Sequence, residues 1–369
     1  MPVKDGLIRP LFSFELLYAL LSYLSAFLYF TSNHLTTHFM EYRKLGKSDL
    51  QISAIAFGAW AAGGWMWGGT DQREAVAAIR RSVELGVTTI DTAPVYGFGL
   101  SEQIVGEAIK GMRQQVQVLT KFGLRWDITE GHLQMTTEDA QGKPIEVRRL
   151  ARKESVIKEC EDSLKRLGTD YIDLLQIHWP DPNTAIEETF GAVAQLLQQG
   201  KIRAAGVSNY NAAQMEQARK VVPIASNQVP YSMLERNIET EVVPYCLQNN
   251  LGILAYSPLQ RGLLTGKIKP GHEFAPGDHR AALSHFSPEN IRRTNEVLEK
   301  IRPLAEQKQA TLSQLVIGWT ICQPGITCAL VGARNPKQAE ENAAAAHIQL
   351  STEEIGQITA HLEELPAAR

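Results

Sequence analysis

Short apolar runs alternate with amphipathic segments along most of this chain. Eight runs rich in Ile, Val, Leu and Ala each have the length of a buried strand. They span residues 52–57, 88–91, 116–121, 172–178, 203–208, 224–228, 253–256 and 326–331. Strands that alternate with helical segments predict a parallel sheet covered by helices.

The segments between these runs carry apolar residues at helical spacing. Residues 73–85 place Ala75, Ile79 and Val83 on one face, with Gly86 as a helix end, and 154–167 repeat the pattern before Gly168. Residues 185–197 form a third such helix. Eight strand–helix repeats predict an α/β fold, a closed (β/α)8 or TIM barrel in a single domain. The first turn, FGAWAAGGWMWGG, lacks the G-x-G-x-x-G spacing of an open dinucleotide-binding sheet.

Two long stretches and the amino-terminus depart from this pattern. Residues 124–150 and 262–289 are predicted to be loops over the site, the first with a short hairpin. Residues 11–30 contain sixteen apolar residues, about enough for a membrane-spanning helix. Residues 1–39 are an apolar extension with three interpretations: an upstream misassigned start before Met40, a membrane anchor, or a secretion signal. Residues 40–369 are expected to form the barrel.

Composition narrows the functional classes. The net charge of −3 gives no electrostatic reason to expect nucleic acid as a partner. Four cysteines without a C-x-x-C pair favour a reducing cytoplasm. If residues 11–30 are retained as an anchor, the flanking Lys and Arg residues leave the barrel on the cytoplasmic side. The histidines form no H-E-x-x-H cluster, so no metal is expected.

Four reactive side chains lie at or just after the ends of three consecutive predicted strands: Asp91, Tyr96, Lys121 and His178. The carboxyl ends of barrel strands share one face, where active sites lie. Reduction of a carbonyl needs a hydride on carbon and a proton on oxygen. Lys121 is expected to lower the pKa of Tyr96 from its usual value of about 10, with Asp91 holding the ammonium and His178 binding the substrate oxygen. Each residue alone has an ordinary structural role, but the four together predict a carbonyl-reducing site.

Later strand ends offer groups for a nicotinamide cofactor. Ser208, Asn209 and Gln228 can bind a carboxamide, and Tyr256 can stack on the nicotinamide ring. Arg334, at a predicted helix start, suits a 2′-phosphate and so favours NADPH/NADP+ over NAD. The remaining candidates are Gly58, Ala59 and Trp60 after the first strand, Ser257, Leu259, Gly262 and Lys267 for the pyrophosphate, and Gly332, Gln338 and Asn342 after the last strand.

Residues 41 to about 360 resemble the aldo-keto reductases. The resemblance rests on DTAPVYGFGLSE, VLTKFG, SLKRLGTDYIDLLQIHWPD, GKIRAAGVSNY, YSPLQRGLLTGK and GARNPKQAEEN. IHWPDP and GGWMWGGTD look most like the bacterial general stress protein branch. The resemblance implies NADPH-dependent reduction of small-molecule aldehydes, with the tetrad roles given above and neither metal nor flavin.

The substrate pocket is predicted from tryptophans in the same loops. Trp65, Trp67, Trp126 and Trp179 suggest an aromatic wall. Arg125 and Arg261 are candidate receptors for a phosphorylated or carboxylated aldehyde. Two other functions stay open: an NADP-binding regulatory subunit resembling potassium-channel β subunits, and a Schiff-base aldolase acting through Lys121, which is disfavoured because Asp91 would keep that lysine charged.

Overall fold

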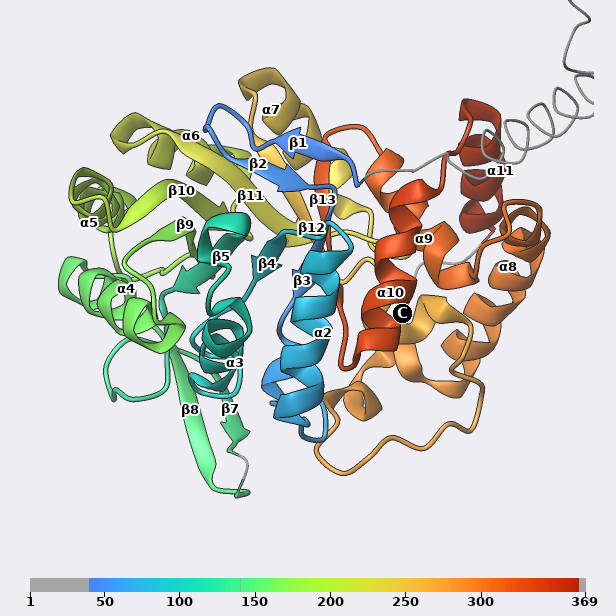
Figure 1. Cartoon of the computed structure of the whole chain (residues 1–369), viewed down its shortest axis with the longest axis horizontal. Helices are drawn as coiled ribbons and strands as arrows, with labels where there is room; N and C mark the ends of the chain where they lie inside the picture. Colours follow the sequence, from blue (N-terminus) through green and yellow to red (C-terminus); the bar gives the residue numbers. More distant parts are fainter. Residues whose placement is uncertain (1–39, 140, 365–369) are drawn as a thin grey trace, which may run out of the picture. The chain divides into compact units, whose positions relative to one another are not determined.

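Eight parallel strands form a closed barrel, which confirms the predicted (β/α)8 fold (Figure 1). The computed structural model describes residues 40–139 and 141–364. Around the barrel the strands are β3 (Ile55–Gly58), β4 (Thr89–Asp91), β5 (Gln117–Phe122), β9 (Ile172–Ile177), β10 (Ile202–Ser208), β11 (Ile224–Pro230), β12 (Gly252–Tyr256) and β13 (Ile326–Gly332). Each predicted apolar run therefore supplies one barrel strand.

Helices surround the barrel in chain order. They are α2 (Gln72–Glu84), α3 (Leu100–Ile109), α4 (Lys153–Leu167), α5 (Ile186–Gln198), α6 (Ala212–Val221), α7 (Val242–Asn249), α8 (Pro288–Gln307), α9 (Leu312–Cys322), α10 (Pro336–Ala344) and α11 (Thr352–Glu363). The three helices predicted by spacing match α2, α4 and α5 to within a residue at each end. Gly168 ends α4 in the left-handed conformation, with φ of 63°.

Alternate residues of each strand face two different apolar layers, as the period of two requires. Leu119, Leu174 and Leu254 belong to the cluster inside the barrel. Their neighbours Val118 and Leu175 belong to the larger cluster between the barrel and the helices. Because both strand faces are buried, the strands appear in the sequence as continuous apolar runs.

A hairpin made of β1 (Tyr42–Lys44) and β2 (Gln51–Ser53) precedes the barrel. Its apolar residues Leu45, Leu50 and Ile52 join the cluster inside the barrel and fill its amino-terminal end. The prediction of one strand over 52–57 was therefore wrong. The run divides at Ala54, because β2 pairs with β1 while β3 pairs in the barrel.

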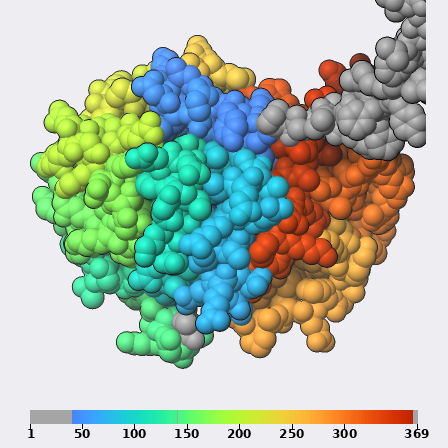
Figure 2. Space-filling model, viewed as in Figure 1, coloured from blue at the N-terminus to red at the C-terminus, as the bar shows by residue number. Residues whose placement is uncertain are grey.

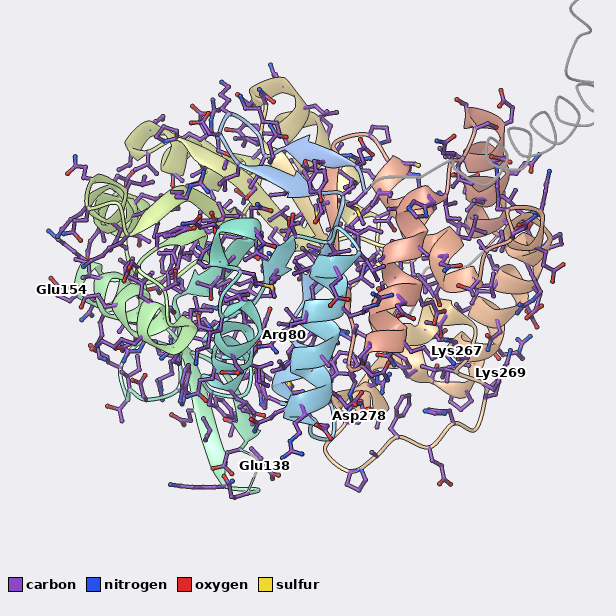
Figure 3. All side chains as sticks on the ribbon, in the orientation of Figure 1. Arg80, Glu138, Glu154, Lys267, Lys269 and Asp278 are labelled. Carbon is purple, nitrogen blue, oxygen red and sulfur yellow. The ribbon has the colours of Figure 1, made fainter. Side chains whose placement is uncertain are left out.

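Two insertions project from the opposite end of the barrel from this hairpin (Figure 1). Residues 124–150 contain β6 (Leu124–Arg125), β7 (His132–Glu138) and β8 (Pro144–Arg149), so the expected hairpin is present in a three-stranded antiparallel sheet. The segment after β12 runs from Lys267 and Lys269 to Asp278, near the lower end of α2 (Figure 3). There Asp278 pairs with Trp67 in an isolated β-bridge.

The helices that follow the first and last barrel strands close its outer layer. α10 packs against α2, and Figure 2 shows the two as neighbouring surfaces. From Met40 onward the chain forms one compact unit. Within residues 40–139 and 141–364, no helix is both long and apolar enough to span a bilayer. The apolar run 11–30 lies outside the described residues.

Candidate active site

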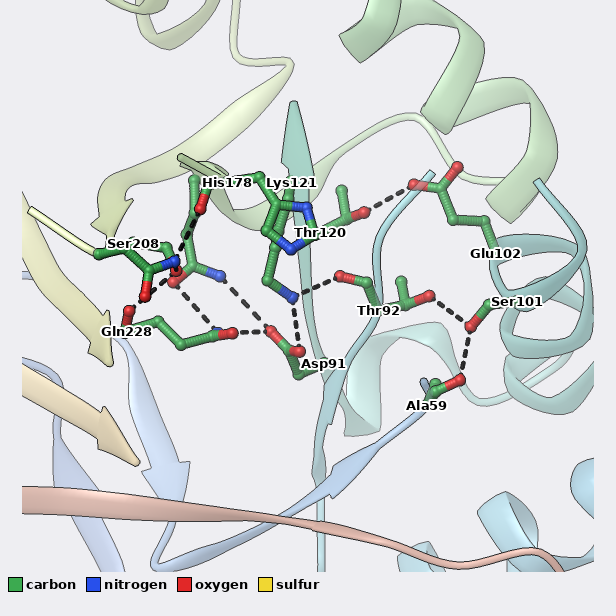
Figure 4. A network of polar contacts seen from close by, with 12 residues as sticks. Ala59, Asp91, Thr92, Ser101, Glu102, Thr120, Lys121, His178, Ser208 and Gln228 are labelled. Carbon is green, nitrogen blue, oxygen red and sulfur yellow. Dashed lines mark hydrogen bonds and ion pairs between the residues drawn. The ribbon is translucent and has the colours of Figure 1, made fainter. Parts of the chain in front are cut away.

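A buried ion pair lies where β4 and β5 end. Lys121 has no exposed surface, and its Nζ lies 2.7 Å from Oδ2 of Asp91 (Figure 4). The same Nζ donates a hydrogen bond of 2.9 Å to the carbonyl of Thr92. Asp91 accepts a second hydrogen bond on Oδ1, from Nε2 of Gln228 at 2.8 Å. Both charged groups are thus compensated, as burial requires.

A second set of hydrogen bonds fixes the ends of these strands. The hydroxyls of Thr92 and Ser101 lie 2.8 Å apart, and Ser101 donates to the carbonyl of Ala59 at 2.9 Å (Figure 4). Thr120, next to Lys121, donates to the buried Glu102 at 2.6 Å. The start of α3 therefore holds the ends of three strands in register.

Tyr96 and His178 lie against this ion pair. Their ring centroids are 5.7 Å apart with the planes almost perpendicular, and Lys121 Nζ is 5.0 Å from the Tyr96 centroid. The backbone N–H of His178 donates to Phe122, which ties the end of β9 to that of β5. The four residues that the sequence singled out are therefore brought together in one place.

The electrostatics of the group differ from expectation in one respect. Burial, and after it the charge of Asp91, raises the pKa of Tyr96 well above its usual value. The net direction is therefore opposite to the lowering expected from Lys121, whose ammonium pairs with Asp91. Burial lowers the pKa of Lys121, with Asp91 opposing the change. Burial and the nearby Lys121 lower the pKa of His178, so its imidazole is neutral at pH 7.

A cavity of about 680 Å³ opens above these residues, and Asp91, Tyr96 and His178 line it. Lys121 is buried beneath and does not reach the cavity surface. The predicted cofactor-binding residues that line the cavity are Gly58, Trp60, Ser208, Asn209, Gln228, Tyr256, Ser257, Leu259, Gly262, Lys267, Gly332, Arg334, Gln338 and Asn342. Ala59 does not line it. Its contribution is the carbonyl that binds Ser101.

The polar groups on the cavity floor are held by one another. Asn209 donates from Nδ2 to the carbonyl of His178 at 3.0 Å and accepts on Oδ1 from the Tyr256 hydroxyl at 3.0 Å. Ser208 donates to the carbonyl of Gln228 at 2.8 Å. The ring of Tyr256 is thereby fixed beside the His178 end of the cavity. An amide-rich floor next to a fixed phenol ring suits a planar carboxamide ligand.

The far end of the cavity is more open and carries charge. The guanidinium of Arg334 donates to the carbonyl of Gly69 at 2.9 Å, and the backbone N–H of Arg334 donates to the side-chain oxygen of Gln338 at 2.8 Å. Lys267 lies 3.4 Å from the carboxylate of Glu341. Asn342 donates to the carbonyl of Gly332. This mouth thus carries two cations, Lys267 and Arg334, and one carboxylate, Glu341.

The tryptophans divide into two groups. Trp65, Trp67 and Trp179 line the cavity with Leu124, Met135 and Val147. Trp126 does not line it, and packs instead on Phe98 with ring centroids 5.6 Å apart. Arg125 is also outside, because Asp127 binds its guanidinium through two hydrogen bonds of 2.8 and 2.6 Å. Neither Trp126 nor Arg125 is placed to touch a ligand.

Other lining residues were missed by the sequence reasoning. Met66, His279, Arg280 and Leu283 enter the cavity wall because the segment after β12 folds across the loop after β3. Gln134 and Met135 come from β7. No local pattern marked these positions, since loop contacts of this kind depend on the fold. Among the described residues, no three His, Cys, Asp or Glu side chains gather as a metal site.

The comparisons with known proteins agree with this geometry. A family model described as the aldo/keto reductase family matches residues 54–363. The chain belongs to the aldo-keto reductases. It is 41% identical over 304 residues to the aldo-keto reductase YhdN of Bacillus subtilis, covering 82% of this chain and 87% of YhdN.

Two further relatives bear on the site of this aldo-keto reductase. One is the NADH-specific methylglyoxal reductase of Escherichia coli, 37% identical over 83% of this chain and 94% of its own length. The other is the structure of glycerol dehydrogenase AKR11B4 from Gluconobacter oxydans. It has a TM-score of 0.78 and 37% identity, and the match covers 89% of this chain and 96% of that one. This aldo-keto reductase is therefore an oxidoreductase that acts on carbonyl groups.

Proposed function

We propose that this aldo-keto reductase reduces aldehydes to alcohols with NADPH, with Tyr96 as the proton donor. The observation that carries the proposal is the cluster on the cavity floor, where Tyr96 and His178 lie over the buried pair of Lys121 and Asp91. A hydroxyl and an imidazole that face one cavity suit a substrate oxygen that must be held and then protonated.

Each side chain has a separate task in this proposal. Because the pKa of Tyr96 is raised, its phenol keeps its proton throughout the neutral range and can donate it. The neutral His178 positions the substrate oxygen by a hydrogen bond. Because the ring is uncharged, it does not repel the ammonium of Lys121. Lys121 stabilises the negative charge that the phenol acquires as the proton leaves. Asp91 keeps Lys121 charged and fixed.

The lining residues fit a nicotinamide dinucleotide. Asn209 and Gln228 present amides at the floor, and Tyr256 presents a fixed ring beside them. When bound, the nicotinamide supplies the hydride. Lys267 and Arg334 at the mouth would hold the phosphates. The cation of Arg334 favours NADPH over NADH. Glu341, which pairs with Lys267, would repel a 2′-phosphate bound close to it. One relative is named NADH-specific.

The proposal is tested by Tyr96→Phe in the full chain, with NADPH oxidation followed at 340 nm on methylglyoxal and 4-nitrobenzaldehyde. Loss of the proton donor is expected to lower kcat by about 10²- to 10⁴-fold, while the Kd for NADPH stays within about threefold. Tyr245→Phe is the matched control, because that hydroxyl binds Glu216 on the outer helices.

Normal turnover by Tyr96→Phe would overturn the assignment of Tyr96. Tight NADPH binding by the wild-type chain without turnover of any aldehyde would contradict the enzymatic function itself.

A further inference from the structure

One side of the cavity is built by the three-stranded sheet inserted after β5. We call this side the hairpin wall, and it consists of Leu124, Gln134, Met135 and Val147. Met135 packs against the same small apolar cluster as Tyr96 and Trp179. The hairpin wall therefore lies beside the proposed proton donor, whereas most groups proposed to hold the cofactor come from β10 to β13 and the segments after them.

Gln134 is an extra residue in β7. The pairing with β8 shifts between Leu133 and Met135, so Gln134 has no partner on that strand. In a regular strand, neighbouring side chains point to opposite faces, and Gln134 would then point away from the face of Met135. The bulge instead lets both consecutive side chains line the cavity. Bulges beside active sites commonly re-aim a side chain in this way.

Arg149 on β8 decides which end of the Gln134 amide is left for a ligand. The Nε–H of Arg149 donates to Oε1 of Gln134. A guanidinium has donors only, so the atom of the amide that faces Arg149 must be the oxygen. The amide nitrogen makes no hydrogen bond to any side chain or backbone group of residues 40–139 and 141–364. Gln134 therefore offers the cavity a hydrogen-bond donor.

The same arginine is anchored to the loop after β9. Its Nη1 donates to the carbonyl of Pro180 at 3.1 Å, and its guanidinium lies 5.3 Å from the ring centroid of Trp179. Arg149 thus holds Gln134 in place from behind. A hydrogen bond from a cation to the amide oxygen also polarises the amide, which makes its N–H groups stronger donors.

The surroundings of this donor are apolar and fixed. The other three residues of the hairpin wall carry no polar side-chain group. Nε1 of Trp65 donates to the hydroxyl of Thr137 at 3.1 Å, which ties β7 to the loop after β3. An N–H in an apolar pocket loses its water when a ligand binds, and a ligand without an acceptor gives nothing in return. A single donor here is therefore selective.

We infer that Gln134 selects aldehydes that carry a second oxygen able to accept a hydrogen bond, such as an ether, hydroxyl or keto oxygen. The inference rests on the proposed function and adds the substrate class to it. The aldehyde oxygen lies at Tyr96 and His178, and the second oxygen lies at the hairpin wall. The enzyme accordingly prefers such aldehydes over alkanals of the same length, which leave the amide N–H unpaired.

The test uses two pairs of aldehydes in which an ether oxygen replaces one CH₂ group. They are methoxyacetaldehyde with butanal, and 3-methoxypropanal with pentanal. The ratio of kcat/KM within each pair is measured for the full chain and its variants, so that the intrinsic reactivity of each aldehyde cancels. Gln134→Met keeps the length of the side chain and removes the donor. The ratio of ether to alkanal should fall about 3- to 10-fold in at least one pair.

Gln134→Glu separates recognition from support of the hairpin. A carboxylate still accepts the hydrogen bond from Arg149, but it has no N–H to donate to a ligand. The ratio should therefore fall in this variant as well, although the contact with Arg149 persists. Gln198→Glu, at an exposed position of α5, is the matched control and should keep the wild-type ratio.

Wild-type ratios for both pairs in Gln134→Met and Gln134→Glu would overturn the inference. So would an equal loss of kcat/KM for the two members of each pair, which would assign Gln134 to support of the hairpin alone. If the wild-type chain reduced no aldehyde at all, 4-nitrobenzaldehyde included, the proposed function would fail and the inference with it.

Discussion

Single residues buried near the site carry charges that the fold must balance. Lys121 and Asp91 balance each other within 2.7 Å. Glu159 on α4 is a different case. Its side chain accepts hydrogen bonds from the N–H of Gly123 and the hydroxyl of Ser155, each at 2.9 Å, but no cation of the described residues pairs with it directly. Gly123 directly follows β5, the strand that supplies Lys121.

Glu159 predicts a pH-dependent stability with an unusual sign. Burial raises its pKa to about 7, against the hydrogen bond from Gly123 and the charge of Arg125. The folded state then binds this proton more tightly than the unfolded state does. Stability is greatest below the unfolded pKa of about 4.5 and falls as the pH rises toward 7, by about 3 kcal/mol.

Urea denaturation of the wild type and Glu159→Gln at pH 5, 6, 7 and 8 measures this effect. The free energy of unfolding of the wild type should fall relative to the variant across the series. Glu154→Gln, an exposed position on the same helix (Figure 3), serves as the control and should follow the wild type. Parallel pH profiles for the wild type and Glu159→Gln would contradict the prediction.

At the scale of elements, the contact between α3 and α4 depends on one residue without a side chain. A Cβ on Gly106 would lie 2.8 Å from the carbonyl oxygens of Arg166 and Leu167. Gly106→Ala should therefore lower the free energy of unfolding by about 1–3 kcal/mol, despite the better helix propensity of alanine. Gly191 in α5 has nothing within 4 Å. Gly191→Ala should instead raise the free energy of unfolding by about 0.5–1 kcal/mol.

Chemical denaturation measures the free energy of unfolding of both variants. If the packing explanation holds, the change relative to the wild type has opposite signs in the two. A gain in stability in both would mean that α3 and α4 separate without cost.

The elements show why part of the fold could be predicted from sequence. Strands buried on both faces appear as apolar runs, and α4 ends at Gly168, so local signals sufficed. The break at Ala54 could not be found, because only the pairing of β2 with the distant β1 creates it.

The same division applies to the site. It was predictable that four residues would lie close together, since residues at the ends of barrel strands must meet on one face: Asp91, Tyr96, Lys121 and His178. Arg125 and Arg261 looked equivalent in sequence. Only the fold reveals that the guanidinium of Arg125 is bound by Asp127, whereas Arg261 lines the cavity. His279 lies beside Arg261 there and is brought to the cavity by a long loop.

For the whole molecule, the cavity joins segments from both halves of the chain. Gly58 is the last residue of the first barrel strand, His178 follows the fourth, and Arg334 follows the last. Arg334 also donates to Gly69, so the loop after β13 is tied to the loop after β3. A ligand that occupies this cavity contacts segments that are distant in sequence. It should therefore stabilise the whole barrel against unfolding rather than one part of it.

Cofactor choice can be measured through this coupling. A ligand that binds only the folded state adds about 2.7 kcal/mol to the free energy of unfolding at a concentration of 100 times its Kd. If Arg334 binds a 2′-phosphate, NADPH should stabilise the wild type more than equimolar NADH does. Arg334→Gln should remove that difference while leaving the NADH effect, because a neutral side chain loses the charge-assisted hydrogen bond. Lys337→Gln, an exposed cation on α10, is the control and should retain the difference. Equal or greater stabilisation of the wild type by NADH would reject NADPH as the preferred cofactor and assign Arg334 to loop contact alone.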